Sequence, residues 1–279
     1  MNSFDQFISG WSWDPLVAIV MGLLIGLYIS GILRLRSLGR FQRGLGRWRA
    51  FSYFFAVFVV FIALSSPIDT YADALLTFHM LQHMLLIMIA APLLLLGRPM
   101  TVVFGALPKR PLRQLLLARP VKAVLRLIGR PIAAWLIAAG VLWVWHLPAL
   151  YNAAVESYVL HSFQHFCFFA SGTLFWWPLV NYPARMFSHP LRLVYVLAAA
   201  VQSSWLGAVL TLAEEGWYHV YQNTTADWGL TPLDDQQLGG LIMWVPGGII
   251  YLLALTVVFF SWMGLGEEGE TPIEVRPAE

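Results

Sequence analysis

The distribution of apolar and polar residues along the chain predicts seven membrane-spanning helices. A span needs about 20 predominantly apolar residues, and seven segments meet or approach that length. They cover residues 15–33, 50–64, 78–97, 131–146, 159–179, 191–212 and 238–263. The second and fourth segments are short and need interfacial residues to extend them. We therefore expect an all-α, polytopic membrane protein whose transmembrane domain covers residues 1–264.

The composition agrees with this expectation. The chain is 59% hydrophobic and 11% charged, whereas a soluble domain has about 25% charged residues. The first residues lack a basic stretch followed by an apolar core and a small-residue cleavage site, so we expect no cleavable signal peptide. Residues 265–279 are acidic and rich in Gly and Pro, which is typical of a solvated tail.

The distribution of charge predicts the orientation of the chain. All 17 Lys and Arg residues lie in or beside the links between spans 1 and 2, 3 and 4, and 5 and 6, or in the C-terminal tail. The remaining links contain Asp and Glu but no Lys or Arg. Because basic loops stay on the cytoplasmic side, the N-terminus is predicted to lie outside and the C-terminus in the cytoplasm. The basic loops would lie against an anionic leaflet, and we expect no nucleic-acid partner.

With this topology, five of the seven histidines gather at the outer face. His79 and His83 open the third span, His161 and His165 open the fifth, and His146 ends the fourth. Both pairs have the form HxxQH, and each follows a proline, a tyrosine and an acid, which favours an internal repeat. Residues i and i+4 project from one side of a helix. Buried imidazoles need partners, so we expect the two pairs to face one small volume.

Such a volume suits a metal ion. Copper and zinc bind imidazole readily, and copper(I) also binds thioether sulfur. Asp235 could ligate a metal, orient an imidazole or cap a helix, while Gly239 and Gly240 would allow a close helix contact within the chain or between chains. The candidate metal ligands are His79, His83, His161 and His165, with His146, Met243, Met80, Met84 and Asp235 as further candidates.

Three stretches of the sequence together resemble a known family. They are HMLQHMLLIMIAAPLLLLGRP, WHLPALYNAAVESYVLHSFQHFCFFASGTLFWWPL and DDQQLGGLIMWVPGG. The combination resembles the multi-spanning CtaG family of cytochrome c oxidase assembly factors, from about Trp48 to Met263. The family motif covers His79, His83, His146, His161, His165, Asp235, Gln236 and Met243.

The resemblance implies a seven-helix protein of the bacterial inner membrane that helps to mature a haem-copper oxidase. It implies a copper-binding factor that passes copper to the catalytic subunit of the oxidase, with a periplasmic copper carrier as a further candidate partner. It implies no enzymatic activity. Homo-oligomerisation is left open.

Three other functions are considered. A membrane b-type haem protein would use histidines from two helices as axial ligands, but i,i+4 spacing places both imidazoles of a pair at nearly one depth. A zinc hydrolase of the HExxH kind needs a glutamate after the first histidine, where this chain has Met80 and Ser162. A metal-free transporter or scaffold would be favoured by charged residues midway through the spans, and the sequence shows none there.

Overall fold

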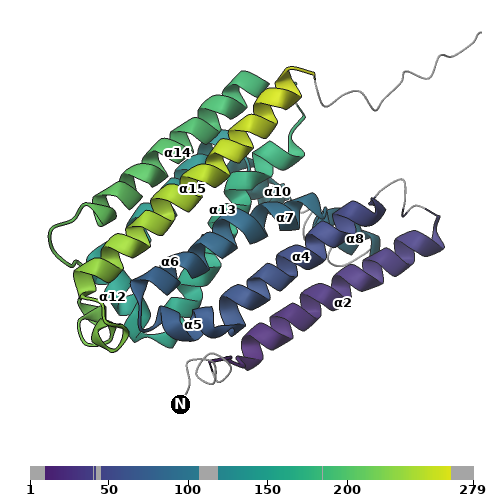
Figure 1. Cartoon of the computed structure of the whole chain (residues 1–279). Coiled ribbons are helices and arrows are strands. Elements are labelled where there is room, and N and C mark those ends of the chain that lie inside the picture. Colours follow the sequence, from purple (N-terminus) through teal and green to yellow (C-terminus); the bar gives the residue numbers. More distant parts are fainter. Residues whose placement is uncertain (1–9, 40, 42–44, 107–118, 184, 265–279) are drawn as a thin grey trace, which may run out of the picture.

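The computed structural model describes residues 10–39, 41, 45–106, 119–183 and 185–264, and within these ranges every regular element is a helix (Figure 1). The predicted all-α fold is therefore confirmed for the described part of the chain. The tail predicted for residues 265–279 lies outside the described residues.

Each predicted apolar segment lies on a helix. The long elements are α2 (Pro15–Ser37), α4 (Gly46–Ser65), the continuous run α6 (Leu76–Met84), η1 (Leu85–Ala90) and α7 (Ala91–Leu96), then α11 (Pro131–Trp145), α13 (Tyr158–Asn181), α14 (His189–Thr211) and α15 (Pro232–Trp262). The short helices are α5 (Pro67–Ala72), α8 (Pro99–Ala106), α10 (Arg119–Ile128), α12 (Pro148–Glu156), η2 (His219–Tyr221) and η3 (Thr225–Trp228).

Five of the described elements are long and apolar enough to cross a membrane, and they correspond to predicted spans 1, 2, 3, 6 and 7. Helices α11 and α12 meet at a bend of 74° and would make a sixth span if they are counted together. Helix α13, which corresponds to predicted span 5, is not among the five although it has 24 residues. It contains two histidines, one glutamine, one asparagine and several hydroxyl side chains, which lower its hydropathy. The protein is thus a membrane protein, while the count of seven crossings and the orientation remain predictions.

Prolines mark where many of these helices begin. Proline occupies the first turn of α2, α5, α11, α12, α14 and α15, where its missing N–H leaves no hydrogen bond unmade. Two of these starts belong to the predicted repeat, because Pro67 begins α5 just before α6, and Pro148 begins α12 just before α13. Each HxxQH motif therefore lies in the first turns of a long helix that follows a short one.

The third span contains a π-helical turn just after the first histidine pair. In η1 the backbone N–H of Ala91 bonds to Leu86 O, a spacing of five residues. The same spacing would pair Ile87 O with the N–H of residue 92, but Pro92 has none. The indole Nε1 of Trp176 donates to Ile87 O instead, at 2.9 Å. A side chain of α13 thus satisfies the carbonyl that Pro92 leaves unpaired, and it ties α13 to the helix of the first histidine pair.

Glycines allow α15 to pack closely against two neighbours. A Cβ atom on Gly240 would lie 2.6 Å from Thr211 Oγ1 of α14. A Cβ atom on Gly239 would overlap the Leu76 side chain of α6. Both glycines therefore serve contacts within this chain.

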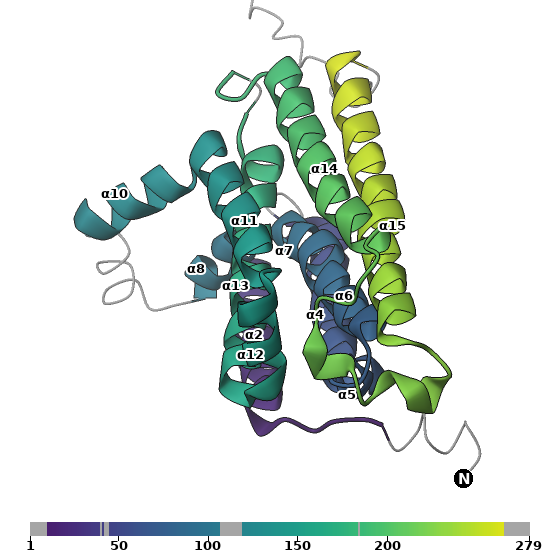
Figure 2. The same ribbon diagram turned by 90° about the vertical axis from the view of Figure 1, so that its left-hand side faces the viewer.

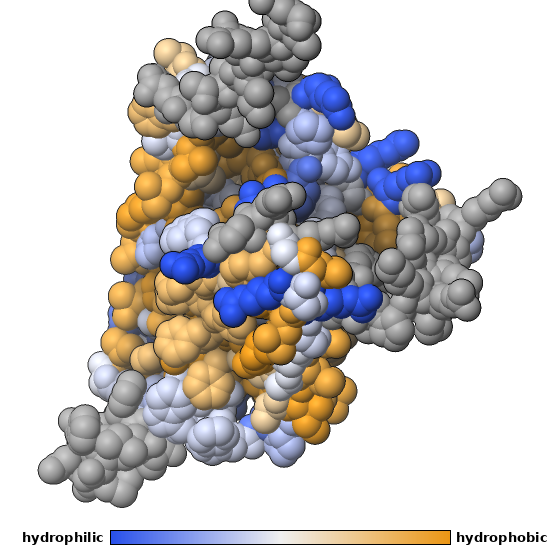
Figure 3. Space-filling view, turned by 90° about the vertical axis from the view of Figure 1, so that its right-hand side faces the viewer, coloured by the Kyte–Doolittle hydropathy of each residue, from blue (hydrophilic) through white to orange (hydrophobic). Residues whose placement is uncertain are grey.

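The outer surface of the bundle is apolar over large areas. Exposed side chains on α2 and α15 include Leu16, Ile19, Leu23, Leu252 and Val257, and Figure 3 shows broad apolar patches interrupted by groups of hydrophilic residues. Figure 2 shows α10 projecting from the bundle at the end opposite α5 and α12. The histidine motifs lie at the α5 and α12 end.

Candidate metal centre

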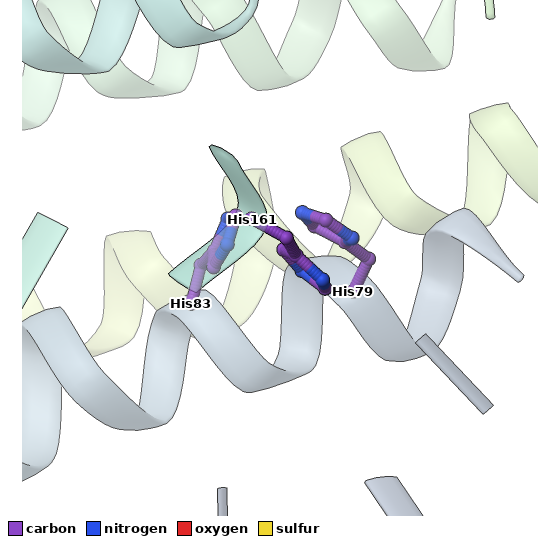
Figure 4. A group of neighbouring side chains, drawn as sticks. All are labelled: His79, His83 and His161. Carbon is purple, nitrogen blue, oxygen red and sulfur yellow. The ribbon is translucent and has the colours of Figure 1, made fainter. Parts of the chain in front are cut away.

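Three histidines from two helices converge at the end of the bundle near α5 and α12. His79 and His83 lie one turn apart on α6, and His161 comes from the first turn of α13 (Figure 4). One ring nitrogen from each lies within 4.8 Å of the other two. Their exposed fractions are 0%, 4% and 9%. We call these three residues the three-histidine centre.

His165 lies beside this centre, with its ring centroid 4.3 Å from that of His161 and 5.4 Å from that of His83. Its Nε2 lies 3.0 Å from Gln82 Oε1. The Gln82 amide nitrogen donates to Ala63 O at 2.8 Å and to Asp69 Oδ1 at 2.7 Å, so Oε1 must be the acceptor. His165 Nε2 therefore carries the hydrogen, and the lone pair lies on Nδ1.

Asp69 holds Gln82 in this position from the short helix α5. Its Oδ1 accepts from Gln82 and its Oδ2 accepts from Ser12 Oγ at 2.9 Å. Burial raises the pKa of Asp69, and the hydrogen bonds from Ser12 and Gln82 act in the opposite direction. A hydrogen bond between Gln82 and His165 thus joins the first HxxQH motif to the second. Asp69 joins the first motif to the short helix α5.

A phenol orients His79. The Nδ1 of His79 lies 3.4 Å from the hydroxyl of Tyr221. This hydroxyl donates to Ala72 O at 3.1 Å, and it lies 3.0 Å from Tyr151 Oη. Burial raises the pKa of Tyr221 far above its usual range, so the hydroxyl keeps its hydrogen. With that hydrogen directed at Ala72 O, the oxygen can accept from His79 Nδ1–H. The lone pair of His79 is then on Nε2.

Several buried ring nitrogens have no hydrogen-bond partner among the described residues. They are His79 Nε2, His83 Nδ1 and Nε2, His146 Nε2 and His161 Nε2. An unsatisfied buried polar atom costs about 1–3 kcal/mol. A metal ion bound by lone pairs of these nitrogens would remove much of that penalty, and neutral imidazole is the donor that copper and zinc accept. The donor set therefore fits a metal ion.

One carboxylate lies beside the centre, and a buried glutamine comes from the same helix as His161. Asp73 Oδ1 lies 3.7 Å from His161 Nδ1, and the Asp73 side chain is 65% exposed. Gln164, the glutamine of the second HxxQH motif, is fully buried, and its amide nitrogen and oxygen have no partner among the described residues. Asp73 thus places a carboxylate on the open side of the centre.

His146 and the candidate methionines lie next to the centre rather than within the group of three. His146 Nδ1 lies 2.6 Å from Leu142 O, so this nitrogen carries the hydrogen and Nε2 has the lone pair. His146, Met80, Met84 and Met243 line a cavity of about 50 Å³ together with His83. The structure therefore groups these sequence candidates on one side of His83.

Asp235 is used elsewhere. Its Oδ2 accepts from the backbone N–H of Leu76 at 2.6 Å, and its Oδ1 accepts from the backbone N–H and the hydroxyl of Thr77 at 3.0 and 2.6 Å. These bonds cap the N-terminus of α6 two residues before His79. Next to it, Gln236 accepts from Trp217 N at 2.6 Å. Asp235 thus fixes the helix that carries two of the three histidines.

Sequence reasoning missed several residues of the site. They are the glutamines Gln82 and Gln164 and the tyrosines Tyr151, Tyr221 and Tyr218, the last of which donates its hydroxyl hydrogen to His146 O at 3.0 Å. The glutamines could have been found, because they recur at the same position of both HxxQH motifs. The tyrosines Tyr218 and Tyr221 lie between two predicted spans, where no hydrophobic pattern marks them.

Comparison with known proteins identifies a family to which the chain is similar. A sequence model of the family described as cytochrome c oxidase caa3 assembly factor matches residues 26–264. An uncharacterized protein of Mycobacterium leprae is 24% identical over 277 residues, and one from Mycobacterium tuberculosis and one from Mycobacterium bovis are each 25% identical over 266 residues. Each alignment covers 92% of this chain and 40% of the relative, so the chain spans less than half the length of these relatives. No solved structure matches the chain.

Proposed function

Because this chain belongs to the family of cytochrome c oxidase caa3 assembly factors, we propose that it binds copper at the three-histidine centre and passes it to the oxidase. The family match begins within α2 and ends after α15, so it extends further toward the N-terminus than the resemblance noted from the sequence. Copper is the cargo in this proposal. The protein itself carries out no catalysis.

The unpartnered ring nitrogens are the observation that carries the proposal. A fold that only had to bury histidines would pair both nitrogens of each ring, as buried polar groups usually are. Here His79, His83 and His161 instead direct nitrogens into a space 4.8 Å across or less. The rings lie too close together for a haem between them, since the His79 and His161 rings are stacked with centroids 4.9 Å apart. A single small ion suits this arrangement better.

The proposed topology places the centre at the outer face of a bacterial inner membrane. Seven crossings with the N-terminus outside would put the basic links in the cytoplasm and the centre near the periplasm. Asp73 would then meet an incoming cation at the open side of His161. A periplasmic copper carrier is the proposed donor, and the catalytic subunit of the oxidase is the proposed recipient.

Transfer requires ligands that release the ion. Neutral imidazoles add no negative charge, so they hold copper less tightly than a closed set of thiolates. Gln82, Tyr221 and Asp235 touch no ion in this proposal; they hold the rings and the start of α6 in place. The residues around the centre thus orient the donors without closing the site.

Copper content after purification tests the proposal. The full chain in detergent should bind copper, and His79→Ala and His161→Ala should each lower the bound copper at least tenfold at a fixed free concentration. His189→Ala is the matched control, because His189 is the first residue of α14 and does not belong to the three-histidine centre. This variant should bind copper as the unaltered protein does. Full copper retention by both His79→Ala and His161→Ala would contradict the proposal. In cells, the same two variants should leave the oxidase deficient in copper.

A further inference from the structure

The cavity beside the three-histidine centre has an unusual lining for the interior of a helical bundle. It lies between α6, α11, α13, α14 and α15, and its volume is about 50 Å³. Four thioether side chains line it, Met80 and Met84 from α6, Met88 from η1 and Met243 from α15, together with the imidazoles of His83 and His146. The space accommodates an ion or a few water molecules.

Methionine in such a place usually fills the core, and Met80 and Met243 do pack in an apolar cluster. Two observations point beyond that use. The side chains leave a cavity instead of filling it. The buried His146 Nε2 also has no partner, although its tautomer is fixed by the bond from Nδ1 to Leu142 O. A buried lone pair therefore lies on the wall of a cavity that is also lined by sulfur.

We propose that this cavity is a second metal site, for a soft monovalent ion, with donors from His146, Met84, Met243 and Met80. The identity of the cargo as copper rests on the function proposed above, and the ion at this second site would be copper(I). Thioether and imidazole together are the donors that copper(I) accepts, whereas harder divalent ions prefer oxygen.

Charge separates the two sites. None of the described residues that line the cavity is an Asp or Glu. A divalent ion there would keep its full double charge in an apolar interior, which is strongly unfavourable. The free-energy cost of burying a monovalent ion is smaller. The three-histidine centre has the Asp73 carboxylate within 3.7 Å of His161 Nδ1, so a copper(I) ion there has a counter-charge that the cavity lacks, and the ion keeps its oxidation state when it moves between the two sites.

His83 connects the two sites. It belongs to the three-histidine centre and also lines the cavity, and both of its ring nitrogens are buried without a partner. A rotation of the His83 imidazole would let His83 pass an ion between the three-histidine centre and the cavity. The second site then holds copper(I) one step further into the bundle, away from the open side at Asp73.

Titration with copper(I) alone, kept reduced and in competition with a chromophoric copper(I) chelator, tests the second site. The full chain in detergent should bind two copper(I) ions. The double variant Met84→Leu/Met243→Leu should lose one of them, with at least a tenfold weaker affinity for that ion, because leucine keeps the shape and removes the sulfur. Met186→Leu changes a methionine that is 66% exposed, and it should behave as the unaltered protein.

X-ray absorption of the copper(I)-loaded unaltered protein provides a readout that needs no variant. A copper–sulfur component is expected, and it should disappear in Met84→Leu/Met243→Leu. Coordination by nitrogen alone, with the same stoichiometry in the double variant, would overturn the second site and leave the three-histidine centre intact. Absence of any bound copper in the unaltered protein would overturn both.

Discussion

Substitution of Asp235 by asparagine is a sharp test of how the histidine-bearing helix is held. Asp235 is fully buried, and its two carboxylate oxygens accept from Leu76 N, Thr77 N and Thr77 Oγ1 at 2.6, 3.0 and 2.6 Å. An asparagine has the same shape, but it carries no charge and only one acceptor oxygen. Its Nδ2 group would face a backbone N–H of α6, so at least one of the three donors would lose its partner.

The size of the effect follows from these contacts. A hydrogen bond to a charged group contributes about 1.5–3 kcal/mol, and a buried donor left without a partner costs about 1–3 kcal/mol. The bonds that remain become weaker because the acceptor is neutral. We therefore expect Asp235→Asn to lower the free energy of unfolding by about 2–4 kcal/mol. The start of α6 should also become less ordered, and this would displace His79 and weaken copper binding.

The neighbouring residue supplies the control. Asp234 is exposed and forms a capping box with Thr231, accepting from Thr231 N at 3.0 Å. Loss of such an exposed cap costs about 1 kcal/mol, so Asp234→Asn should be the milder change. Unfolding of the detergent-solubilised variants, followed by circular dichroism at increasing denaturant, measures both. Equal destabilisation by the two substitutions would refute the role assigned to Asp235. Loss of copper with unchanged stability would instead favour Asp235 as a ligand.

Two further substitutions test the packing around the site. Trp176→Phe removes the indole that donates to Ile87 O at the π-helical turn, and it should lower the free energy of unfolding by about 1–3 kcal/mol. The control Trp205→Phe, at a residue 64% exposed, should change the free energy of unfolding little. Similar losses for both variants in a denaturant titration would contradict this reasoning. Gly240→Ala places a Cβ atom 2.6 Å from an α14 side-chain oxygen and should destabilise by about 1–3 kcal/mol through overpacking. Gly248→Ala, where nothing lies within 4 Å, should be neutral or stabilising in the same denaturant titration.

The positions of the helices could be predicted because hydropathy and proline report on local structure. Every predicted apolar segment lies on a helix, and Pro15 and Pro131 begin helices α2 and α11 as N-terminal prolines do. The bend between α11 and α12 was not predicted. It falls at the residues around Leu147 and Pro148, where the chain leaves one helix and starts another, and periodicity alone does not give that angle.

The convergence of His79, His83 and His161 could be anticipated from the two HxxQH motifs, since both open helices that were predicted to run in the same direction. The partners of those rings could not. Asp235 caps α6 from 158 or 159 positions away, and Tyr221 reaches His79 across 142 positions. Such contacts depend on how α15 and the link before it pack against α6. No local pattern in the sequence encodes that packing.

Hydrogen bonds to one ring of the three-histidine centre, His79, and to two neighbouring rings, His165 and His146, explain why each of these rings has a free lone pair. Gln82 accepts from His165 Nε2, Leu142 O accepts from His146 Nδ1, and Tyr221 lies at His79 Nδ1. Each of these oxygens accepts a hydrogen bond from one ring nitrogen and leaves the lone pair on the other nitrogen, where it can bind a metal ion. A second-shell oxygen of this kind fixes the tautomer and direction of a metal-binding imidazole. Apolar side chains at these buried positions would leave no polar atoms without a partner, and the presence of imidazoles there instead supports the proposed metal site.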